Sequence, residues 1–404
     1  MTTRIEPTLT IGPDSGDLRG ADDRVLQAGI EYLNRLNGGV LRLLPGVYTM
    51  RNALYLRPNI TLQGSGPETV LKKAPSTVSP LIQESDWYES RVRVENPVGF
   101  SAGSGLLLRG YYEGGYLPMI VVKDTITAVE GDTLSLSKRL DYNFWPSKRA
   151  TAATLYPLIT AEYVDNVTIE NLTLDGNRNE NDAINGNYAG GVFLQHCDRY
   201  TLRNVISRNY NGDGFSFQVC DDIRFENCVS ENNANLGFHP GSGSQRPVFS
   251  RCVSRGNGLG LFFCWGVSDG LAEECILSDN LDFGVSIGHR DTDNKLVRCT
   301  VERNAKVGVL FREDDGDPFV AGHRTVIDSC LIRDNGVAAD GVGVDVRAEV
   351  YDTTIRNCRI EDSGQGLQRV GVRIGPKAQR VHLEDNHFTG VKSPVQDLRH
   401  PSSS

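Results

Sequence analysis

Hydrophobic and polar residues alternate in short segments that recur at a long, constant period over the C-terminal half of the chain. Each segment begins at a glycine, and successive glycines are separated by 23, 23, 23, 24 and 24 residues. These glycines are Gly191, Gly214, Gly237, Gly260, Gly284 and Gly308. Gly343 and Gly371 continue the series at wider spacing, with an insertion at 314–324. A fixed period of this size predicts a solenoid, in which each coil stacks on the previous one.

Each repeat reads as strand, turn, strand, turn, with no segment long enough for a helix between the strands. Such strands pair with their copies one coil away, about 4.8 Å along the solenoid. Side chains alternate across a strand, so the apolar positions one and three residues after each glycine, such as Phe215 and Phe217, are expected to point inward. The positions two and four residues after each glycine are expected to point outward, where a ligand can reach them.

A column of cysteines supports this register. Cys228, Cys252, Cys275, Cys299, Cys330 and Cys358 each lie in a short strand-like segment. Asn171 and Asn204 are expected to occupy the same column in earlier coils. Because the chain has no CxxC pair, we interpret the cysteines as small apolar residues stacked in a core, and not as metal ligands or disulfides.

The N-terminal part begins with an amphipathic segment. Residues 21–37 carry apolar residues at helical spacing, among them Leu26, Ile30 and Leu33, and Gly38-Gly39 is expected to end the helix. Alternating strand-like segments follow. A helix in this place can cap the open end of a solenoid, whose first coil would otherwise expose its core and strand edges.

The run at 38–73, GGVLRLLPGVYTMRNALYLRPNITLQGSGPETVLKK, resembles the N-terminal cap of pectate-lyase-like β-helix proteins. The resemblance covers residues 15–75 closely and the later repeats in style. It implies a right-handed parallel β-helix and a carbohydrate substrate. It does not specify the reaction, because hydrolases, lyases, epimerases and phage tailspikes share this architecture.

Residues 85–157 interrupt the pattern, and 121–138 reads as a hairpin with a Gly-Asp turn. We interpret this stretch as an inserted β-subdomain. Its aromatic residues either pack it onto the helix, which we favour for most of them, or wall a sugar cleft. They are Trp87, Tyr88, Tyr111, Tyr112, Tyr116, Tyr142, Phe144 and Trp145.

The predicted fold is therefore all-β, a right-handed parallel β-helix with an N-terminal capping helix and an inserted β-subdomain. The expected divisions are 1–84 for the cap and first coils, 85–157 for the insertion, 158–390 for the coils that carry the active-site face, and 391–404 for a tail.

Charge and hydropathy limit the classes of binding partner that we expect. The net charge is -9, acids and bases are interleaved, and no basic block is present, so nucleic acid is not an expected partner. No run of 18 apolar residues predicts a membrane span. No secretory signal is visible after Met1, which predicts a cytoplasmic protein if Met1 is native and a periplasmic or secreted one if a leader was removed. The sequence does not specify an oligomeric state.

The outward positions carry an unusual set of residues for a purely structural face, with glycines that leave room for a ligand. We expect a polysaccharide or oligosaccharide to lie there. A first cluster, Asp213, Gln218 and His239, lies on two adjacent coils, about 5 Å apart. The full predicted substrate-binding set is Asp213, Gln195, Gln218, His239, Trp265 as a stacking platform, Arg347, and His323 folded over from the later insertion.

A second cluster is chemically richer and supplies the predicted catalytic residues, His289, Arg290, Asp291, Arg312 and Glu313. Its distance from the first cluster is about three coils, roughly 14 Å, which suits two subsites of one chain and is too long for one proton transfer. β-Elimination of a uronate needs a base and neutralisation of the substrate carboxylate by Ca²⁺ or arginine. The predicted Ca²⁺ ligands are Asp291, Asp293, Glu313 and Asp314.

The resemblance implies a specific base, because in lyases of this superfamily an arginine beside the Ca²⁺ site takes the proton. That role would fall to Arg312 or Arg290. Cleavage of a uronate-containing polysaccharide by β-elimination is the leading hypothesis.

Two other functions stay open. A glycoside hydrolase would use Asp291 and Glu313 as paired carboxylates on neighbouring coils. A non-catalytic carbohydrate-binding or tailspike-like protein would use the face without turnover. The run GFHPGSGSQ at 237–245 resembles the GFDPH-type motif of alginate C5-epimerases, with His and Asp out of the expected order, which disfavours epimerisation.

Overall fold

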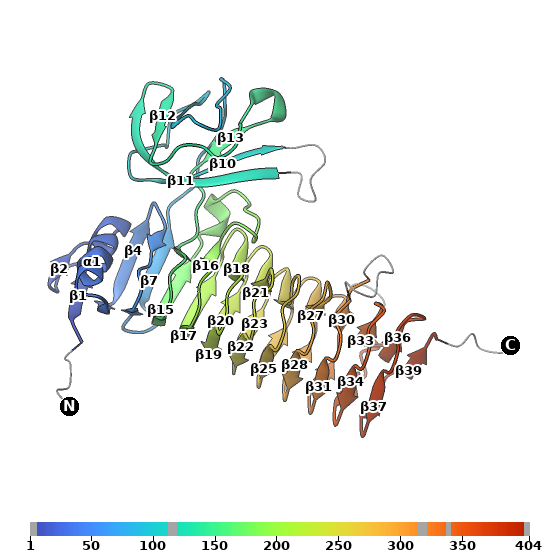
Figure 1. The fold of residues 1–404 in the computed structure, drawn as a ribbon. Coiled ribbons are helices and arrows are strands. Elements are labelled where there is room, and N and C mark those ends of the chain that lie inside the picture. The colour runs from blue at the N-terminus through green and yellow to red at the C-terminus, as the bar shows by residue number, and fades with distance from the viewer. Residues whose placement is uncertain (1–5, 112–118, 314–320, 337–340, 400–404) are drawn as a thin grey trace.

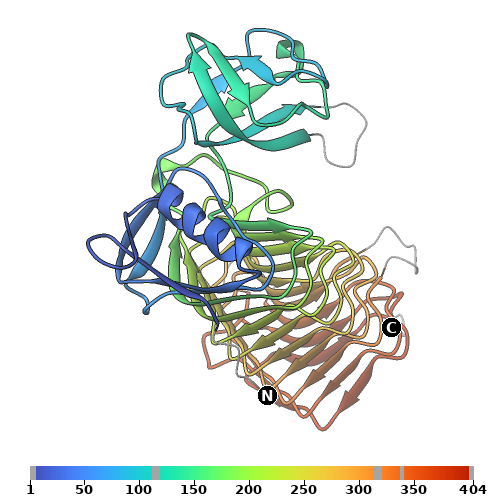
Figure 2. The same cartoon turned by 60° about the vertical axis from the view of Figure 1, so that its left-hand side comes forward.

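The computed structural model describes residues 6–111, 119–313, 321–336 and 341–399. The chain forms a parallel β-helix whose coils stack along one axis, with a separate subdomain above its N-terminal end (Figures 1 and 2). Its core is one continuous apolar cluster that runs through the coils. No helix among these residues is long and apolar enough to cross a membrane.

An 11-stranded parallel sheet forms the wall that carries the aligned glycines. Its strands are β5 (Leu54–Tyr55), β14 (Ile159–Glu162), β16 (Gly190–Gln195), β18 (Asp213–Gln218), β21 (Leu236–Gly241), β24 (Leu259–Phe262), β27 (Phe283–Ile287), β30 (Val307–Phe311), β33 (Val342–Val346), β36 (Val370–Ile374) and β39 (Ser393–Asp397). The repeat register is confirmed, since Phe215 pairs with Phe238 and Val285 with Val309, all four buried.

A 22-stranded sheet forms the rest of the wall. It consists of β1 (Thr8–Gly12), β2 (Leu18–Arg19), β3 (Gly39–Leu43), β4 (Gly46–Met50), β6 (Ile60–Gln63), β7 (Thr69–Lys73), β15 (Val167–Asp175), β17 (Tyr200–Arg208), β19 (Arg224–Glu226), β20 (Val229–Glu231), β22 (Val248–Ser250), β23 (Val253–Arg255), β25 (Leu271–Glu273), β26 (Ile276–Ser278), β28 (Lys295–Val297), β29 (Thr300–Glu302), β31 (Val326–Asp328), β32 (Leu331–Arg333), β34 (Thr354–Arg356), β35 (Arg359–Glu361), β37 (His382–Glu384) and β38 (His387–Thr389). Each short strand pairs with its copy in the next coil, as the period predicts.

The cysteine column is apolar packing, as predicted. All six cysteines are free and buried. The prediction for Asn171 and Asn204 is wrong by one position. Strand pairing places Leu172 and Val205 in the cysteine column. The two asparagines instead occupy the sharp corner before it, with φ of 57° and 53°, a left-handed conformation that asparagine tolerates.

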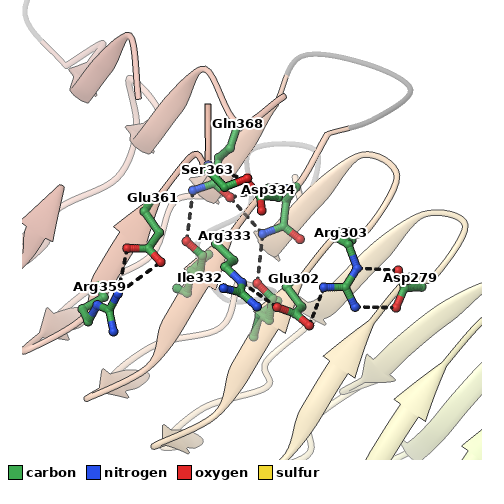
Figure 3. Close-up of polar contacts among 12 residues, drawn as sticks. Asp279, Glu302, Arg303, Ile332, Arg333, Asp334, Arg359, Glu361, Ser363 and Gln368 are labelled. Atoms are coloured by element: carbon green, nitrogen blue, oxygen red, sulfur yellow. Dashed lines mark hydrogen bonds and ion pairs between the residues drawn. The ribbon is translucent and has the colours of Figure 1, made fainter. Parts of the chain in front are cut away.

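A second column, this one polar, runs inside the β-helix and was not predicted from the sequence. It consists of Asn233, Asn257, Asn280, Asn304, Asn335 and Gln368, all at most 1% exposed. Each side-chain carbonyl accepts a hydrogen bond from a backbone N–H one coil back; for example, Asn257 Oδ1 accepts from the Asn233 N–H at 2.9 Å. Each amide group donates to a backbone carbonyl, and Gln368 does so to Ile332 at 3.1 Å (Figure 3). The ladder satisfies turn groups that would otherwise be buried without partners.

Helix α1 (Asp23–Arg35) covers the N-terminal end, as predicted for 21–37. Asp22 caps it by accepting from the N–H groups of Arg24 and Val25. Leu26 and Ile30 are fully buried against the first coils. The helix therefore closes the apolar core that the first coil would expose.

The insertion is a six-stranded sheet with its own apolar core. Its strands are β8 (Val78–Pro80), β9 (Arg91–Arg93), β10 (Gly105–Tyr111), β11 (Met119–Glu130), β12 (Thr133–Leu136) and β13 (Thr151–Ala153). It thus begins before residue 85, the expected start. At the other end, β39 adds a strand inside the segment 391–404 that we expected to be a tail. Two short 3-10 helices, η1 (Pro146–Lys148) and η2 (Arg178–Glu180), complete the elements.

Lys73 is a fully buried base in the first coils. Its ammonium lies 3.1 Å from Asn211 Oδ1 and about 5 Å from the ring centroids of Tyr156 and Tyr210. Burial lowers the pKa of Lys73 to about 7. In the unfolded chain Lys73 takes up its proton below its ordinary pKa of 10.5, whereas in the folded chain it does so only below about pH 7. Between these two pH values the unfolded chain therefore binds more protons than the folded chain.

Stability should therefore rise with pH between these values, and Lys73→Met should remove that rise. Urea unfolding at about pH 7 and about pH 9.5 measures this, and we expect the stability gain of the variant over the parent to be about 1–3 kcal/mol larger at the lower pH. Equal free energy differences between variant and parent at both pH values would show that Lys73 is charged in the folded state.

Candidate active site

The outer face of the 11-stranded sheet carries the positions two and four residues after each aligned glycine, which were predicted to face a ligand. Many of these side chains are buried under other parts of the chain. Ser216 pairs in register with His239, and both are at most 3% exposed. Loop 181–189 lies over this part of the sheet, where the Gly186 carbonyl accepts from Ser216 Oγ at 2.7 Å. The insertion holds the loop through an ion pair of 2.5 Å between Arg109 and Asp182.

Asp213 and His239 form a buried pair on adjacent coils. His239 Nδ1 lies 2.7 Å from Asp213 Oδ2, and Asp213 Oδ1 accepts from the backbone N–H of Leu236 at 3.1 Å. A carboxylate in this position favours a proton on Nδ1 and leaves Nε2 as the basic atom. His239 Nε2 is buried and has no hydrogen-bond partner among the described residues.

Asp291 anchors the turn after β27. Its side chain is fully buried and accepts from the backbone N–H groups of Gly266, Val267 and Gly288 at 2.9 to 3.1 Å. Its remaining contact is an ion pair of 3.0 Å with Arg312. Burial raises the pKa of Asp291 to about 6, against the opposite effect of Arg312 and the backbone donors.

Arg312 extends from the end of β30 back across two coils. Its guanidinium donates to Ser286 Oγ and to the Phe263 carbonyl, each at 2.9 Å. It also lies 4.3 Å from the ring centroid of Phe262. Gly288 makes this path possible, because a Cβ there would lie 3.0 Å from Arg312 Nε. That Nε is buried and has no partner in the described part of the chain.

Phe262 joins the two predicted clusters into one site. Its ring makes an edge contact with His239, with 5.5 Å between centroids, and packs under Arg312 on another side. Burial raises the pKa of the Cys264 thiol to about 12, Arg312 lowers it, and Asp291 and Asp213 raise it, so charges from both clusters act on this side chain. The expected separation of three coils holds for the backbones but not for the side chains, because Arg312 spans the gap.

Asp291 does not fit the exposed catalytic role predicted for it. Its oxygens accept from three backbone N–H groups and Arg312, and none of its surface is accessible. A carboxylate that attacks or protonates a sugar must reach it. The structure therefore makes Asp291 the residue that positions Arg312.

The other predicted catalytic residues lie beside the site. His289 is half-buried in the turn after β27 and packs on Trp265, with 5.4 Å between ring centroids. Arg290 is exposed on that turn, and Glu313 is exposed directly after Arg312. Asp314 lies outside the described residues.

The described members of the predicted metal-binding set, Asp291, Asp293 and Glu313, do not gather into one site. The described residues contain no group of three His, Cys, Asp or Glu side chains that could hold a metal ion. Asp293 forms an ion pair of 2.6 Å with Arg324, and Asp291 has the buried partners given above. A Ca²⁺ ion stays a prediction, which the described carboxylates do not support.

Of the predicted substrate-binding residues, Gln218 is buried beside Ser216, and Gln195 lies half-buried one coil earlier. Arg347 is exposed and forms an ion pair of 2.7 Å with Asp345. His323 does not fold over the site. Its Nδ1 accepts from the N–H of Tyr351 in the next coil, and the two rings pack 4.7 Å apart.

A charged cleft under the insertion continues this face toward the N-terminus, which the sequence did not reveal. It has a volume of about 400 Å³ and is lined by Arg57, Lys123, Lys138 and Glu162, among others. Lys123 Nζ lies 3.9 Å from the ring centroid of Phe193, and burial lowers the pKa of Lys123 to about 8. These residues come from the cap, the insertion and a coil, so no single segment indicated the cleft.

Residues 158–322 match the family model of the right handed beta helix region. The chain is a right-handed parallel β-helix protein. This confirms the fold that the resemblance of residues 38–73 implied. No curated protein sequence matches this β-helix protein.

Among solved structures, the β-helix protein is similar to the A-modules of two mannuronan C-5 epimerases from Azotobacter vinelandii. The likeness to AlgE4 has a TM-score of 0.60 at 18% identity and covers 96% of this chain and 97% of that chain. The likeness to AlgE6 has a TM-score of 0.56 at 15% identity and covers 93% and 91%. At these identities the comparison shows a shared fold, and the reaction has to be argued from the site.

Proposed function

We propose that the β-helix protein is an enzyme that acts on a uronate-containing polysaccharide by removing the proton at C5 of a uronate residue. The arrangement that carries this proposal is the Asp213–His239 pair and the Arg312 guanidinium, which contact two sides of Phe262. Two nitrogens of this arrangement, His239 Nε2 and Arg312 Nε, are buried without partners among the described residues. A buried polar atom without a partner calls for an explanation, and a catalytic role is one of them.

Each residue then has a defined task. Arg312 pairs with the uronate carboxylate and stabilises the charge that moves onto it when the C5–H bond breaks. His239 Nε2 takes the proton, and Asp213 stabilises the imidazolium that forms. In β-elimination the C5 electron pair forms the C4=C5 double bond, the C4–O4 bond breaks, and the leaving O4 takes up a proton from the imidazolium or from water.

Epimerisation shares the first half of this reaction. It differs in that a proton returns to C5 from the opposite face and the chain stays intact. The similarity to two mannuronan C-5 epimerase modules over nearly the whole chain favours it as the second candidate. Against it, His239 occupies the place of the aspartate in the GFDPH-type motif, and Gly241 occupies the place of the histidine.

The hydrolase hypothesis becomes weaker, because one of its two carboxylates, Asp291, is buried and fully bonded. A purely binding function does not require a histidine whose orientation is fixed by a carboxylate. In either enzymatic case loop 181–189 has to move before a sugar reaches His239, since both members of the Asp213–His239 pair are almost inaccessible.

A panel of pectate, alginate and glycosaminoglycans, each incubated with and without chelator, tests the proposal. Lyase activity gives the ultraviolet absorbance of an unsaturated uronate, and epimerase activity gives changed C5 stereochemistry by NMR. Loss of turnover with chelator would support the predicted Ca²⁺. New reducing ends with saturated termini would point to hydrolysis and contradict the proposal.

The ionisation of Asp291 should control how well the substrate binds. A neutral Asp291 attracts the Arg312 guanidinium less, so Arg312 is held less firmly for the substrate carboxylate. We therefore expect KM to rise below about pH 6, the pKa to which burial raises Asp291. In Asp291→Asn, KM should be high and should not change across about pH 6. A KM that rises equally below pH 6 in the variant would contradict this role.

A further inference from the structure

Four aromatic side chains gather around one hollow on the inserted subdomain, and the proposed reaction uses none of them. Trp87, Tyr111, Tyr142 and Trp145 line a cavity of about 570 Å³. Their exposed fractions are 64%, 38%, 51% and 37%. Large apolar side chains that gather on the surface of a soluble protein indicate a binding site. We call this site the aromatic hollow.

The other aromatic residues of the insertion behave differently. Phe144 is fully buried in the core of the subdomain, and Tyr88 is exposed outside the aromatic hollow. Tyr112 and Tyr116 lie outside the described residues. Aromatic residues are therefore not exposed evenly over the insertion, because four of the exposed rings line the same cavity.

The backbone frame of the aromatic hollow is fixed by hydrogen bonds. Ser85 and Phe144 exchange two backbone hydrogen bonds of 3.0 and 2.8 Å, and Asn143 Oδ1 accepts from the N–H of Trp87 at 2.9 Å. Because Phe144 points into the core, its neighbours Asn143 and Trp145 point into the hollow. The backbone that carries Trp87 and Trp145 is thus held in place before a ligand arrives, which reduces the entropy cost of binding.

The polar lining defines the chemistry of the ligand. Asp141, Asn143 and Lys148 stand among the rings and offer a carboxylate, an amide and an ammonium. We infer that the aromatic hollow binds sugar rings of a carbohydrate chain. The C–H faces of a pyranose pack on aromatic rings, while its hydroxyls both donate to and accept from such polar groups. The cavity has the volume of a small-molecule site.

Charge argues against two other ligands. Nucleic acid and anionic membrane surfaces bind through several cations. Among the described residues that line the aromatic hollow, Lys148 is the cation and Asp141 the carboxylate. Arg149 packs on the Tyr111 ring, 4.1 Å from its centroid, and the chain carries a net charge of -9. A sugar chain held by ring stacking and hydroxyl contacts needs no such excess of positive charge, and the carboxylate of a uronate residue can pair with Lys148 or Arg149.

The position of the subdomain suits the aromatic hollow to hold the substrate near the candidate active site, an interpretation that rests on the proposed function. The subdomain stands over the N-terminal coils on the side of the 11-stranded sheet (Figures 1 and 2). A polysaccharide held in the aromatic hollow stays at high effective concentration near the Asp213–His239 pair. Carbohydrate binding in the hollow, in contrast, does not depend on which reaction the site performs.

Tryptophan fluorescence can test binding in the aromatic hollow alone. The chain has three tryptophans, two in the hollow and Trp265 beside the candidate active site. In Trp265→Phe, every fluorescence change therefore reports on Trp87 or Trp145. Hexasaccharides of polymannuronate, polygalacturonate and cellulose are titrated into this variant, with single-stranded DNA and phosphatidylserine vesicles as competing ligand classes. We expect a saturable change with at least one saccharide.

Adding Tyr142→Ala should raise Kd by about tenfold. Adding Tyr88→Ala instead should leave Kd unchanged, because Tyr88 is also an exposed tyrosine of this subdomain but lies outside the hollow. Arg312→Lys should lower kcat/KM by about 10²-fold or more and leave the fluorescence response intact, which separates this inference from the proposed function. No response to any saccharide, a response unaffected by Tyr142→Ala, or a response to DNA or vesicles alone would overturn the inference.

Discussion

Replacing His239 with asparagine should lower kcat by about 10²–10⁴-fold while the protein stays folded. The asparagine amide can still donate to Asp213 in place of Nδ1, so the buried carboxylate keeps its partner, but the variant has no base for the C5 proton. Steady-state kinetics on the polysaccharide found in the panel measures the loss, and near-ultraviolet circular dichroism checks the fold.

Two companion variants make this result specific. Arg312→Lys keeps the positive charge but cannot reach Ser286, Phe263 and Asp291 together with a planar fork, so kcat/KM should fall by about 10²-fold or more. His323→Asn removes a half-buried histidine that packs on Tyr351 away from the site and should retain kcat. Full activity in His239→Asn would remove His239 from the mechanism.

Replacing Asn257 with alanine should lower the free energy of unfolding by about 2–4 kcal/mol. Asn257 Oδ1 accepts from the N–H of Asn233 at 2.9 Å, and its amide donates to the Ser230 carbonyl at 2.9 Å and to Ser254 Oγ at 3.0 Å. Alanine removes the acceptor of the buried Asn233 N–H and a donor to the Ser230 carbonyl, whereas Ser254 Oγ keeps its bond to the Gly260 carbonyl. Because stacked coils share these contacts, the loss should also broaden the unfolding transition.

The matched control is Asn179→Ala, an exposed asparagine in η2. Urea unfolding followed by circular dichroism should show a change of less than about 0.5 kcal/mol for this variant. Equal stabilities of the Asn257→Ala and Asn179→Ala proteins would mean that the internal ladder is not a source of stability.

The fold could be predicted because every coil repeats the same stacking problem. A constant spacing between glycines sets the strand register, and alternation within the strand then determines that Phe215 and Phe217 point inward. Columns with a distinctive residue, such as the cysteines, could therefore be predicted from the sequence. The column of Asn257 and its equivalents was not, because asparagine in a turn is typical of any loop, and its inward direction depends on the coil geometry.

The site could be predicted only in part, because alternation gives the direction of a side chain but not its reach. It places Asp213 and His239 on adjacent coils, where they do pair. It cannot show that Arg312 lies across two coils, which depends on the absence of a side chain at Gly288. Nor can it show that Asp291 is buried, since its partners are backbone N–H groups.

The fate of the C5 hydrogen tests the central claim most directly. A polyuronate that is turned over in the panel is prepared with deuterium at C5, and the β-helix protein is assayed for release of that deuterium into water. We predict release by the parent protein, through elimination or epimerisation, and at least about 10²-fold slower release by His239→Asn and Arg312→Lys. Fragments that retain the C5 deuterium would contradict proton abstraction and favour hydrolysis.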